Sequence, residues 1–398
     1  MRCKVSGIKI KPFMSFGKMP MANGFLKKKD FKKEFFYNLK VGFCKDHKLF
    51  QLNDYPKSPY IFNNKYPFYT SKSVFMIAHF KKYFKWVKNK FLKPKSKIIE
   101  IGSNDGTLLQ NFSKHKFTHL GFEPSKNVAN LSKKKGVNVI TKFFSYKNSK
   151  SLKNFKSQTD LICAANAISH IPDLTDLIKG INYLLSRKGV FVFEEPYLGS
   201  MFKKVSYDQI YDAHVFIFSV HSVKKIFEDF GFDLIDAIPQ KTHGGSMRYV
   251  IARANERPIK KSIKKLLKKE IRQKIHSLES CLKFKQACKI SKKKFKSKII
   301  KLKKEGKTIC GYAASAKSTT VLNYCKIGNN LIDFIADSTE EKIGKYSPGT
   351  HIPVVSTEAF RKNYPDIAIL CAWNHKDEIL KKEKKFTKYG GKWITHVK

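Results

Sequence analysis

From Lys97 to Arg253, strand-like and helix-like segments alternate along the chain. The strand-like runs are KIIEIG, THLGFEP, GVNVITKFF, DLICAANAI, GVFVFEEPY, FDLIDAIPQ and MRYVIAR. Helical stretches separate most of them, which is typical of an α/β fold with a doubly wound, mostly parallel sheet. The last two runs are separated only by KTHGGS, which is too short for a crossover helix. We therefore predict that they pair as an antiparallel hairpin.

The pattern divides the chain into four parts. Residues 1–70 are rich in Gly, Pro, Phe and Lys and predict a small N-terminal module, and residues 71–255 form the central α/β domain, entered through a helix between about 70 and 95. Residues 256–305 are rich in lysine, with apolar residues at three- and four-residue steps that predict one connecting helix with a single buried face. Those positions are Ile259, Ile263, Leu267, Ile271, Ile275, Leu278 and Leu282. Residues 306–398 repeat the alternation and predict a second α/β domain.

The charge of the chain is strongly positive. Its 80 Lys and Arg residues exceed its 31 Asp and Glu residues by 49. Such an excess favours phosphate binding and raises the hypothesis of a nucleic-acid partner. However, only seven of these residues are Arg, and the lysines are spread along the whole chain, so we interpret them as a solvated surface that favours small anionic substrates.

Apolar runs are short throughout the sequence. None approaches the ~20 residues of a membrane-spanning helix. The N-terminal MRCKVSGIKIK lacks the apolar region of a secretory signal, so we expect a cytoplasmic protein. We interpret the eight cysteines as reduced thiols, because they are sparse and several lie within strand-like runs.

A glycine-containing turn follows the first strand of the central domain. The run IIEIGSNDGTLLQNF places Gly102 and Gly106 between a strand and a helix start. Glycines there allow close approach of the backbone to a ligand, and free amides at the helix start can bind its polar atoms. Glu123 ends the next strand, where an acid can accept hydrogen bonds from ribose hydroxyls. A purely structural turn is the alternative to a nucleotide-like cofactor site.

Three histidine-containing segments follow predicted strands or open loops at the carboxyl edge of the sheet, where ligands gather in open α/β folds. They are NAISHIPD, QIYDAHVFIFS and THGGSMR. Their candidate functional residues are His170, Tyr211, His214, His243 and Arg248. For each segment taken alone, a structural histidine or a plain turn is the alternative.

The glycine turn, the acid at the next strand end and the terminal hairpin together resemble class I S-adenosylmethionine-dependent methyltransferases. In that family the turn holds the amino acid part of the cofactor, the acid binds the ribose, and the end of the fourth strand lies near the methionyl group. The resemblance implies a cofactor site made of Glu100, Gly102, Asn104, Asp105, Gly106, Glu123 and Asn166. No Asn-Pro-Pro-Tyr motif follows that strand, which argues against methylation of an amine.

Over almost its whole length the sequence resembles the nucleotide-sugar C-methyltransferases. The motifs NxxxHxPD, YxxHxxxFS and HGGSxR occur in the family's order, followed by GYAASAKSTTVLNY, PGTHIPV and AWNHKDEI. The resemblance implies transfer of a methyl group to a carbon adjacent to the carbonyl of a keto-deoxysugar nucleotide. The alternatives are a methyltransferase that acts on RNA or another polyanion, and a catalytically inactive methyltransferase-fold binding protein.

The resemblance also implies roles for individual residues. His214 matches the family's base, Tyr211 and His170 match polar active-site positions, and either Tyr66 or Tyr69 matches a tyrosine contributed by the N-terminal module. For substrate binding we predict Tyr66, Tyr69, His243, Arg248 and Lys317, of which Lys317 can contact phosphate groups. Family members commonly carry Glu directly before the base, whereas this chain has Ala213. The orienting carboxylate is therefore missing or has moved to Asp212.

The family's N-terminal module binds zinc through two Cys-x-x-Cys pairs. Here the matching positions read Cys3-Lys-Val-Ser6 and Cys44-Lys-Asp-His47. Closed structural zinc sites use four ligands, and serine is not a usual one. Zinc held by three residues stays an alternative, but we favour a module without metal.

Overall fold

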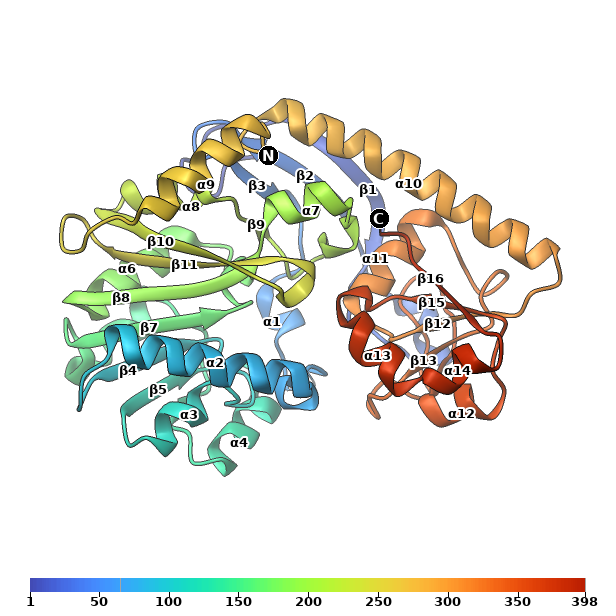
Figure 1. The fold of residues 1–398 in the computed structure, drawn as a ribbon, viewed down its shortest axis with the longest axis horizontal. Coiled ribbons are helices and arrows are strands. Elements are labelled where there is room, and N and C mark those ends of the chain that lie inside the picture. Colours follow the sequence, from blue (N-terminus) through green and yellow to red (C-terminus); the bar gives the residue numbers. More distant parts are fainter. Residues whose placement is uncertain (65, 398) are drawn as a thin grey trace.

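The computed structural model describes residues 1–64 and 66–397. Its strands form three sheets, here called the N-terminal, central and C-terminal sheets. Figure 1 shows the central and C-terminal sheets side by side, with the N-terminal strands between them and the long helix α10 (Leu278–Lys304) running along one side of the molecule. Among the described residues, none of the helices combines the length and the hydropathy that crossing a membrane requires.

The central sheet has seven strands in the order β10-β11-β8-β7-β4-β5-β6. Only β11 runs antiparallel to its neighbours β8 and β10, and the remaining pairs are parallel. This confirms both the predicted hairpin and the class I methyltransferase sheet. The strands are β4 (Lys97–Ile101), β5 (Thr118–Phe122), β6 (Val139–Ile140), β7 (Thr159–Ala165), β8 (Leu185–Pro196), β10 (Phe232–Gln240) and β11 (Ser246–Arg253).

The predicted strand GVNVITKFF is much shorter than expected. Only the two residues of β6 pair, at the edge of the sheet. The chain then leaves the sheet, and Phe144 packs into the core with its ring centroid 5.1 Å from that of Phe122. The apolar residues of this run are therefore used for packing beyond the strand as well as for pairing.

Helices cover both faces of the central sheet. The predicted entry helix is α2 (Val74–Phe91), whose buried residues recur at helical spacing from Met76 to Val87. The other helices are α3 (Leu109–Lys114), α4 (Lys126–Lys134), α5 (Tyr146–Lys150), α6 (Leu174–Leu184), α7 (Leu198–Lys204) and α8 (Val220–Glu228).

The N-terminal sheet includes a strand from the middle of the chain. Its order is β1-β2-β3-β9, with β1 (Pro12–Pro20), β2 (Phe36–Cys44), β3 (Leu49–Leu52) and β9 (Phe216–Ile217). Phe50 pairs with Ile217 across the β3–β9 ladder. The two-residue strand β9 directly follows the segment that carries Tyr211 and His214, so this pairing ties the N-terminal sheet to the candidate site.

The lysine-rich connector is two helices, so the prediction of a single helix was wrong. Helix α9 (Lys261–Arg272) ends near Lys274, which has a left-handed φ of 52° that cannot continue an α-helix, and α10 begins at Leu278. The break also changes which predicted positions are buried. Ile263 and Ile275 are buried, whereas Ile259, Ile271 and Leu282 are about half exposed.

The C-terminal sheet is parallel throughout, in the order β14-β13-β12-β15-β16, which confirms the second alternation. Its strands are β12 (Ile309–Tyr312), β13 (Phe334–Asp337), β14 (Val354–Ser356), β15 (Ile367–Leu370) and β16 (Lys392–Ile394). Its helices are α11 (Ala316–Cys325), α12 (Thr357–Lys362), α13 (Lys376–Lys382) and α14 (Lys384–Lys388).

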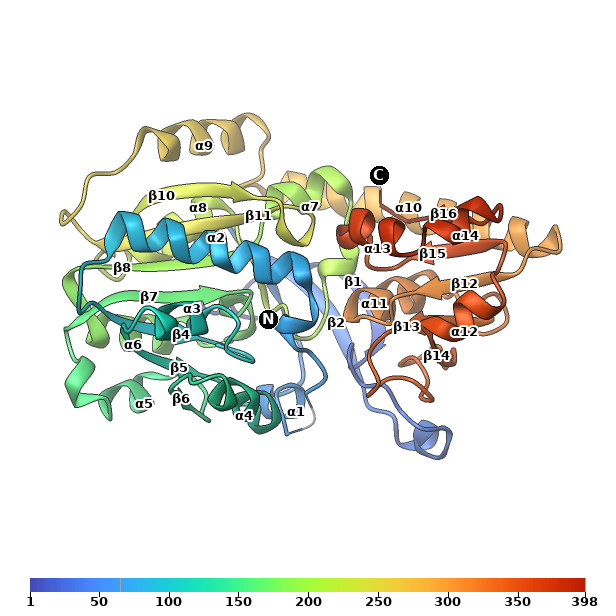
Figure 2. The ribbon, with the colours of Figure 1, turned by 60° about the horizontal axis from the view of Figure 1, so that its bottom comes forward.

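The C-terminal unit packs against the carboxyl edge of the central sheet (Figure 2). Trp373 donates from Nε1 to Asp208 Oδ2 at 2.8 Å, and Thr320 Oγ1 donates to the Ile210 carbonyl at 3.1 Å. The segment that leads to His214 therefore lies between the two units.

Candidate active site

The glycine turn after β4 folds tightly against the end of β7. Gly102 and Gly106 have φ values of 71° and 76°. A Cβ at Gly102 would lie 2.5 Å from the Cβ of Ala167, so no other residue fits there without displacing the turn. The two glycines therefore hold the backbone in a conformation and at a packing distance that other residues would disturb.

Glu123 closes the other side of this turn. Its Oε2 accepts from the Asn104 amide at 3.0 Å, and its Oε1 accepts from the Ser125 amide at 2.8 Å. Burial raises the pKa of its carboxyl group above the usual value. Each carboxylate oxygen retains a second lone pair, so Glu123 can also accept from ligand hydroxyls.

Buried polar atoms without a partner gather around the same edge. Glu100 Oε2 and Asn166 Oδ1 are enclosed and have no hydrogen-bond partner among the described residues. Burial raises the pKa of Glu100, with further contributions from Asp105 and Glu123. Buried polar groups are normally paired, so these atoms fit a site that a polar ligand completes.

The side chains of Asn104 and Asp105 are bound to the N-terminal part of the chain. Asn104 Oδ1 accepts from the amide and hydroxyl of Thr70 at 2.9 and 3.0 Å. Asp105 Oδ2 accepts from the Ser71 amide at 3.0 Å. The side chains of these two predicted cofactor residues therefore hold residues 70–71 against the 102–106 turn.

His214 is held in one tautomer. The distance from its Nδ1 to the backbone oxygen of Gln209 is 2.7 Å, and because a carbonyl oxygen only accepts, Nδ1 carries the proton. Nε2 therefore has a free lone pair, which accepts from the Tyr211 hydroxyl at 2.7 Å. Burial, together with nearby His170, places the pKa of His214 well below its ordinary value. The ring is neutral and able to accept a proton at Nε2.

Asp212 contacts neither of the ring nitrogens of His214, which bind the Gln209 carbonyl and the Tyr211 hydroxyl. Asp212 accepts from the Ala22 amide through Oδ2 and from the Ala213 amide through Oδ1, both at 2.8 Å. It therefore attaches this segment to the residues that follow β1. Of the two alternatives left open by the sequence, the carboxylate that orients the base is missing, and the Gln209 carbonyl orients His214 instead.

His170 lies beside His214. Their ring centroids are 5.3 Å apart at an interplanar angle of 21°, and Phe62 stacks on His170 at 5.4 Å. Burial lowers the pKa of His170 to about 4. Its Nε2 is enclosed without a hydrogen-bond partner among the described residues. A neutral imidazole with an unsatisfied nitrogen can bind a polar substrate atom.

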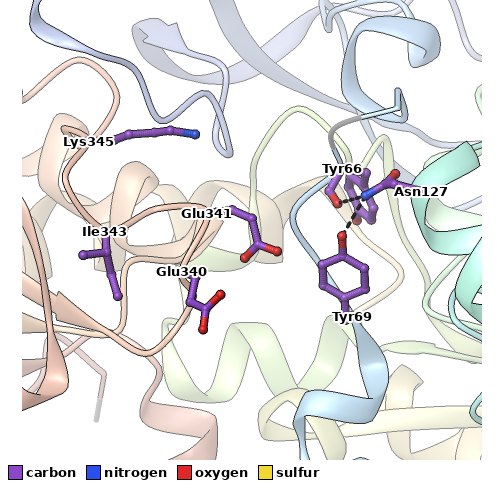
Figure 3. Close-up of a pocket in the computed structure, with 7 residues that line it drawn as sticks. All are labelled: Tyr66, Tyr69, Asn127, Glu340, Glu341, Ile343 and Lys345. Carbon is purple, nitrogen blue, oxygen red and sulfur yellow. Dashed lines mark hydrogen bonds between the residues drawn. The ribbon is translucent and has the colours of Figure 1, made fainter.

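Both candidate tyrosines of the N-terminal part line a pocket of about 360 Å³ (Figure 3). Asn127 Nδ2 donates to the Tyr66 carbonyl at 2.9 Å and to the Tyr69 hydroxyl at 2.8 Å. The opposite side of the pocket is formed by C-terminal residues, namely Glu340, Glu341, Ile343 and Lys345. Burial raises the pKa of Tyr66, with smaller contributions from the charges of Glu123 and Asp212.

Arg248, a predicted substrate-binding residue, forms a buried ion pair with Glu194. Its Nε lies 2.6 Å from Glu194 Oε1, and both side chains are almost completely buried. The guanidinium group also lies over the rings of Tyr83 and Trp86, 4.4 and 4.6 Å from their centroids. These contacts fasten β11 and β8 to helix α2 and occupy Nε and Nη2 of the guanidinium group.

His243 and Lys317 lie where the two units meet. His243 has a φ of 51° and an enclosed Nε2 without a partner among the described residues, and burial lowers its pKa with a contribution from Lys317. Lys317 lies 5.4 Å over the Trp373 ring, and its Nζ donates to Asn374 Oδ1 at 3.3 Å. Burial lowers the pKa of Lys317. A cation here, beside the candidate site, can bind an anionic group of a substrate.

Sequence reasoning missed Glu195. This fully buried carboxyl accepts from the amides of Ile168 and Ser169 through Oε1, at 2.7 and 3.1 Å. It thereby holds the turn that carries His170. Burial raises its pKa to about 7. The only signal in the sequence was the pair of acids in the run GVFVFEEPY. Two adjacent charged residues are unexpected at the end of an otherwise apolar strand.

Three metal-binding side chains meet in the N-terminal part. The ligand atoms of Cys3, Cys44 and His47 all lie within 4.8 Å of one another, and all three residues are buried. Two thiols and one imidazole nitrogen are suitable ligands for zinc. The donor set therefore fits the metal, which these three residues would hold, although the sequence alone favoured a module without metal.

Comparison with known families accounts for nearly the whole chain. A putative zinc binding domain matches residues 3–62, a methyltransferase domain matches 76–237, and a C-methyltransferase C-terminal domain matches 241–397. The C-methyltransferase NovU of Streptomyces niveus is 28% identical over 387 residues, which cover 96% of this chain and 92% of NovU. Together these matches support S-adenosylmethionine-dependent C-methyltransferase activity for this chain. This C-methyltransferase is an enzyme that uses S-adenosylmethionine.

Several solved structures of methyltransferases are also similar to part of this chain. A methyltransferase from Archaeoglobus fulgidus is 18% identical, with a TM-score of 0.35 over 42% of this chain and 71% of its own. Magnesium protoporphyrin IX methyltransferase from Synechocystis, solved with bound S-adenosylmethionine, is 13% identical, with a TM-score of 0.35 over 45% of this chain and 79% of its own. The fold assignment of the C-methyltransferase rests on its strand order.

Proposed function

We propose that this C-methyltransferase methylates a carbon adjacent to the carbonyl of a keto-deoxysugar nucleotide. The observation that carries the proposal is the neutral His214, whose free Nε2 is paired with the Tyr211 hydroxyl at 2.7 Å. Carbon becomes a nucleophile only after a proton is removed, and an acceptor of this kind suits a carbon flanked by a carbonyl group. The match to NovU over nearly the whole of both chains supports the same reaction class.

The geometry supports a proton path through two side chains. The single lone pair of His214 Nε2 already faces the Tyr211 hydroxyl, so the substrate proton reaches Nε2 either through the Tyr211 oxygen or after Tyr211 moves aside. The Gln209 carbonyl then stabilises the imidazolium through Nδ1–H. His170, stacked on His214, is positioned to bind the sugar or the enolate oxygen.

The cofactor and the substrate would approach the Tyr211–His214 pair from different sides. When bound, S-adenosylmethionine supplies an activated methyl group on a sulfonium. We assign its binding to the 102–106 turn and Glu123, with Glu100 and Asn166 completing the polar contacts. Lys317 and His243, which line the junction with the C-terminal unit, would bind the anionic nucleotide part of the substrate.

The proposal is tested with isotopically labelled S-adenosylmethionine and a panel of 4-keto-deoxysugar nucleotides. We expect a product heavier by one methyl group, and exchange of the neighbouring carbon-bound hydrogen with solvent. His214→Asn should abolish both. If wild-type enzyme methylated no sugar nucleotide but methylated RNA with a strong salt dependence, the polyanion alternative would replace the proposal.

A further inference from the structure

We propose that Asp229 fixes the tautomer of His47, so that Cys3, Cys44 and His47 form a three-ligand zinc site that fastens the N-terminal sheet to helix α8. The proposal concerns residues outside the candidate active site and is independent of the substrate. It rests on one buried cluster and on one hydrogen bond that connects two distant parts of the chain.

The cluster has the arrangement that metal binding requires. His47 Nδ1 lies 3.8 Å from the sulfur of Cys3 and 3.8 Å from the sulfur of Cys44. All three residues are at most 5% exposed. Cys3 lies near the chain start, Cys44 ends β2, and His47 lies in the turn between β2 and β3. One nitrogen therefore faces two sulfurs from different segments.

Asp229 determines which ring nitrogen of His47 carries the proton. His47 Nε2 lies 2.8 Å from Asp229 Oδ2. A carboxylate only accepts hydrogen bonds, so Nε2 carries the proton and Nδ1 presents its lone pair toward the two sulfurs. Metal-binding histidines commonly donate their second ring nitrogen to a carboxylate in this way, which fixes the ring and makes it a better ligand.

The same hydrogen bond joins two parts of the fold. Asp229 is the C-terminal cap of α8, 182 positions beyond His47, and it also binds Lys225 of that helix at 3.1 Å. A metal that holds His47 would therefore also hold the β2–β3 turn against α8. Because metal binding free energy adds to the stability of the structure that forms the site, zinc should stabilise this contact.

Within residues 1–64 and 66–397, no fourth cysteine, histidine or carboxylate joins this cluster. Ser6 occupies the position where the first Cys-x-x-Cys pair would end, and it is exposed. A solvent molecule is then the expected fourth ligand, and zinc should bind more weakly than in a four-cysteine site. Ser6→Cys supplies the missing thiolate and should tighten binding.

The full-length chain is stripped of metal with a chelator and titrated with Co²⁺ and then with Zn²⁺ in competition with a coloured chelator. We expect one ion per chain and a thiolate-to-cobalt charge-transfer band. Asp229→Ala should lower zinc affinity about tenfold to a hundredfold. Zinc should raise the melting temperature of wild type more than that of Asp229→Ala.

Glu228→Ala is the matched control. Glu228 is the neighbouring acid on α8, and its carboxylate pairs with Lys224. Its removal should leave zinc affinity unchanged. Unchanged affinity for S-adenosylmethionine will show that each variant is folded. The proposal is overturned if Asp229→Ala binds zinc as tightly as wild type, or if wild type shows no charge-transfer band at stoichiometric Co²⁺.

Discussion

The Tyr211 hydroxyl lies 2.7 Å from Nε2 of His214, the ring nitrogen that has no proton of its own. The only basic lone pair of the imidazole is thus already in contact with a phenol. Under the proposed function, transfer of a substrate proton to His214 would therefore involve Tyr211, which would either carry the proton or move aside. This relationship distinguishes the site from one with an isolated histidine base.

Tyr211→Phe should slow methyl transfer about a hundredfold or more, because the proton path loses its oxygen. Affinity for S-adenosylmethionine should stay near the wild-type value, since Tyr211 does not belong to the 102–106 turn that is proposed to bind the cofactor. Single-turnover kinetics and calorimetric titration measure the two effects separately. Tyr60→Phe, at an exposed tyrosine, is the control. Wild-type turnover by Tyr211→Phe would exclude the phenol from the path.

Ionisation of Glu195 should lower the free energy of unfolding as pH rises. Burial raises its pKa from the ordinary 4.5 to about 7, so the unfolded chain loses this proton at lower pH than the folded chain does. The stabilising contribution is complete below about pH 4.5 and is lost as pH rises through 7. Glu195→Gln keeps an acceptor for the Ile168 and Ser169 amides but has no proton to lose. The free energy of unfolding of Glu195→Gln, relative to that of wild type, should therefore rise between pH 5 and pH 8 by about 3 kcal/mol at most.

Urea unfolding at several pH values measures this difference. Glu305→Gln, at an exposed acid, serves as the control and should follow wild type across the range. A constant difference between Glu195→Gln and wild type from pH 5 to pH 8 would show that Glu195 has no raised pKa.

Arg248 should matter for stability more than for substrate affinity. Arg248→Met leaves the buried Glu194 without its guanidinium partner and should cost about 3–5 kcal/mol. His79 Nε2, 2.6 Å from Glu194 Oε2, would be the remaining side-chain partner of this carboxylate among the described residues. The double variant Arg248→Met/Glu194→Gln should recover part of the loss, because the buried carboxylate charge is gone. Chemical denaturation measures both. A raised KM with unchanged stability would instead support the substrate-binding role predicted from the sequence.

Gly102→Ala should weaken binding of S-adenosylmethionine at least tenfold. The added methyl group would meet Ala167 at 2.5 Å and push the turn away. Gly136→Ala is the matched control, because Gly136 has a similar φ of 72° and no atom lies within 4 Å of the position that its added methyl group would take. Both variants carry about 1–2 kcal/mol of left-handed strain. Only Gly102→Ala should lose cofactor affinity in a calorimetric titration, and equal losses would point to strain alone.

Much of the fold followed from local pattern. Strand and helix periodicity predicted the alternation of strands and helices in the central and C-terminal domains, because each element repeats its apolar residues over a few neighbouring positions. The short separation of β10 and β11 was sufficient to predict their hairpin. Motif order was sufficient to identify the reaction class. These features depend on residues that are close in sequence.

Other features required the folded chain. The pairing of β9 with the N-terminal sheet, the ion pair of Arg248 with Glu194, and the hydrogen bond between His47 and Asp229 join residues far apart in sequence. No local period encodes such contacts. The raised pKa of Glu195 likewise depends on its burial. Local sequence thus determined which elements form, whereas long-range packing decided which polar groups are buried and paired, and hence what each does.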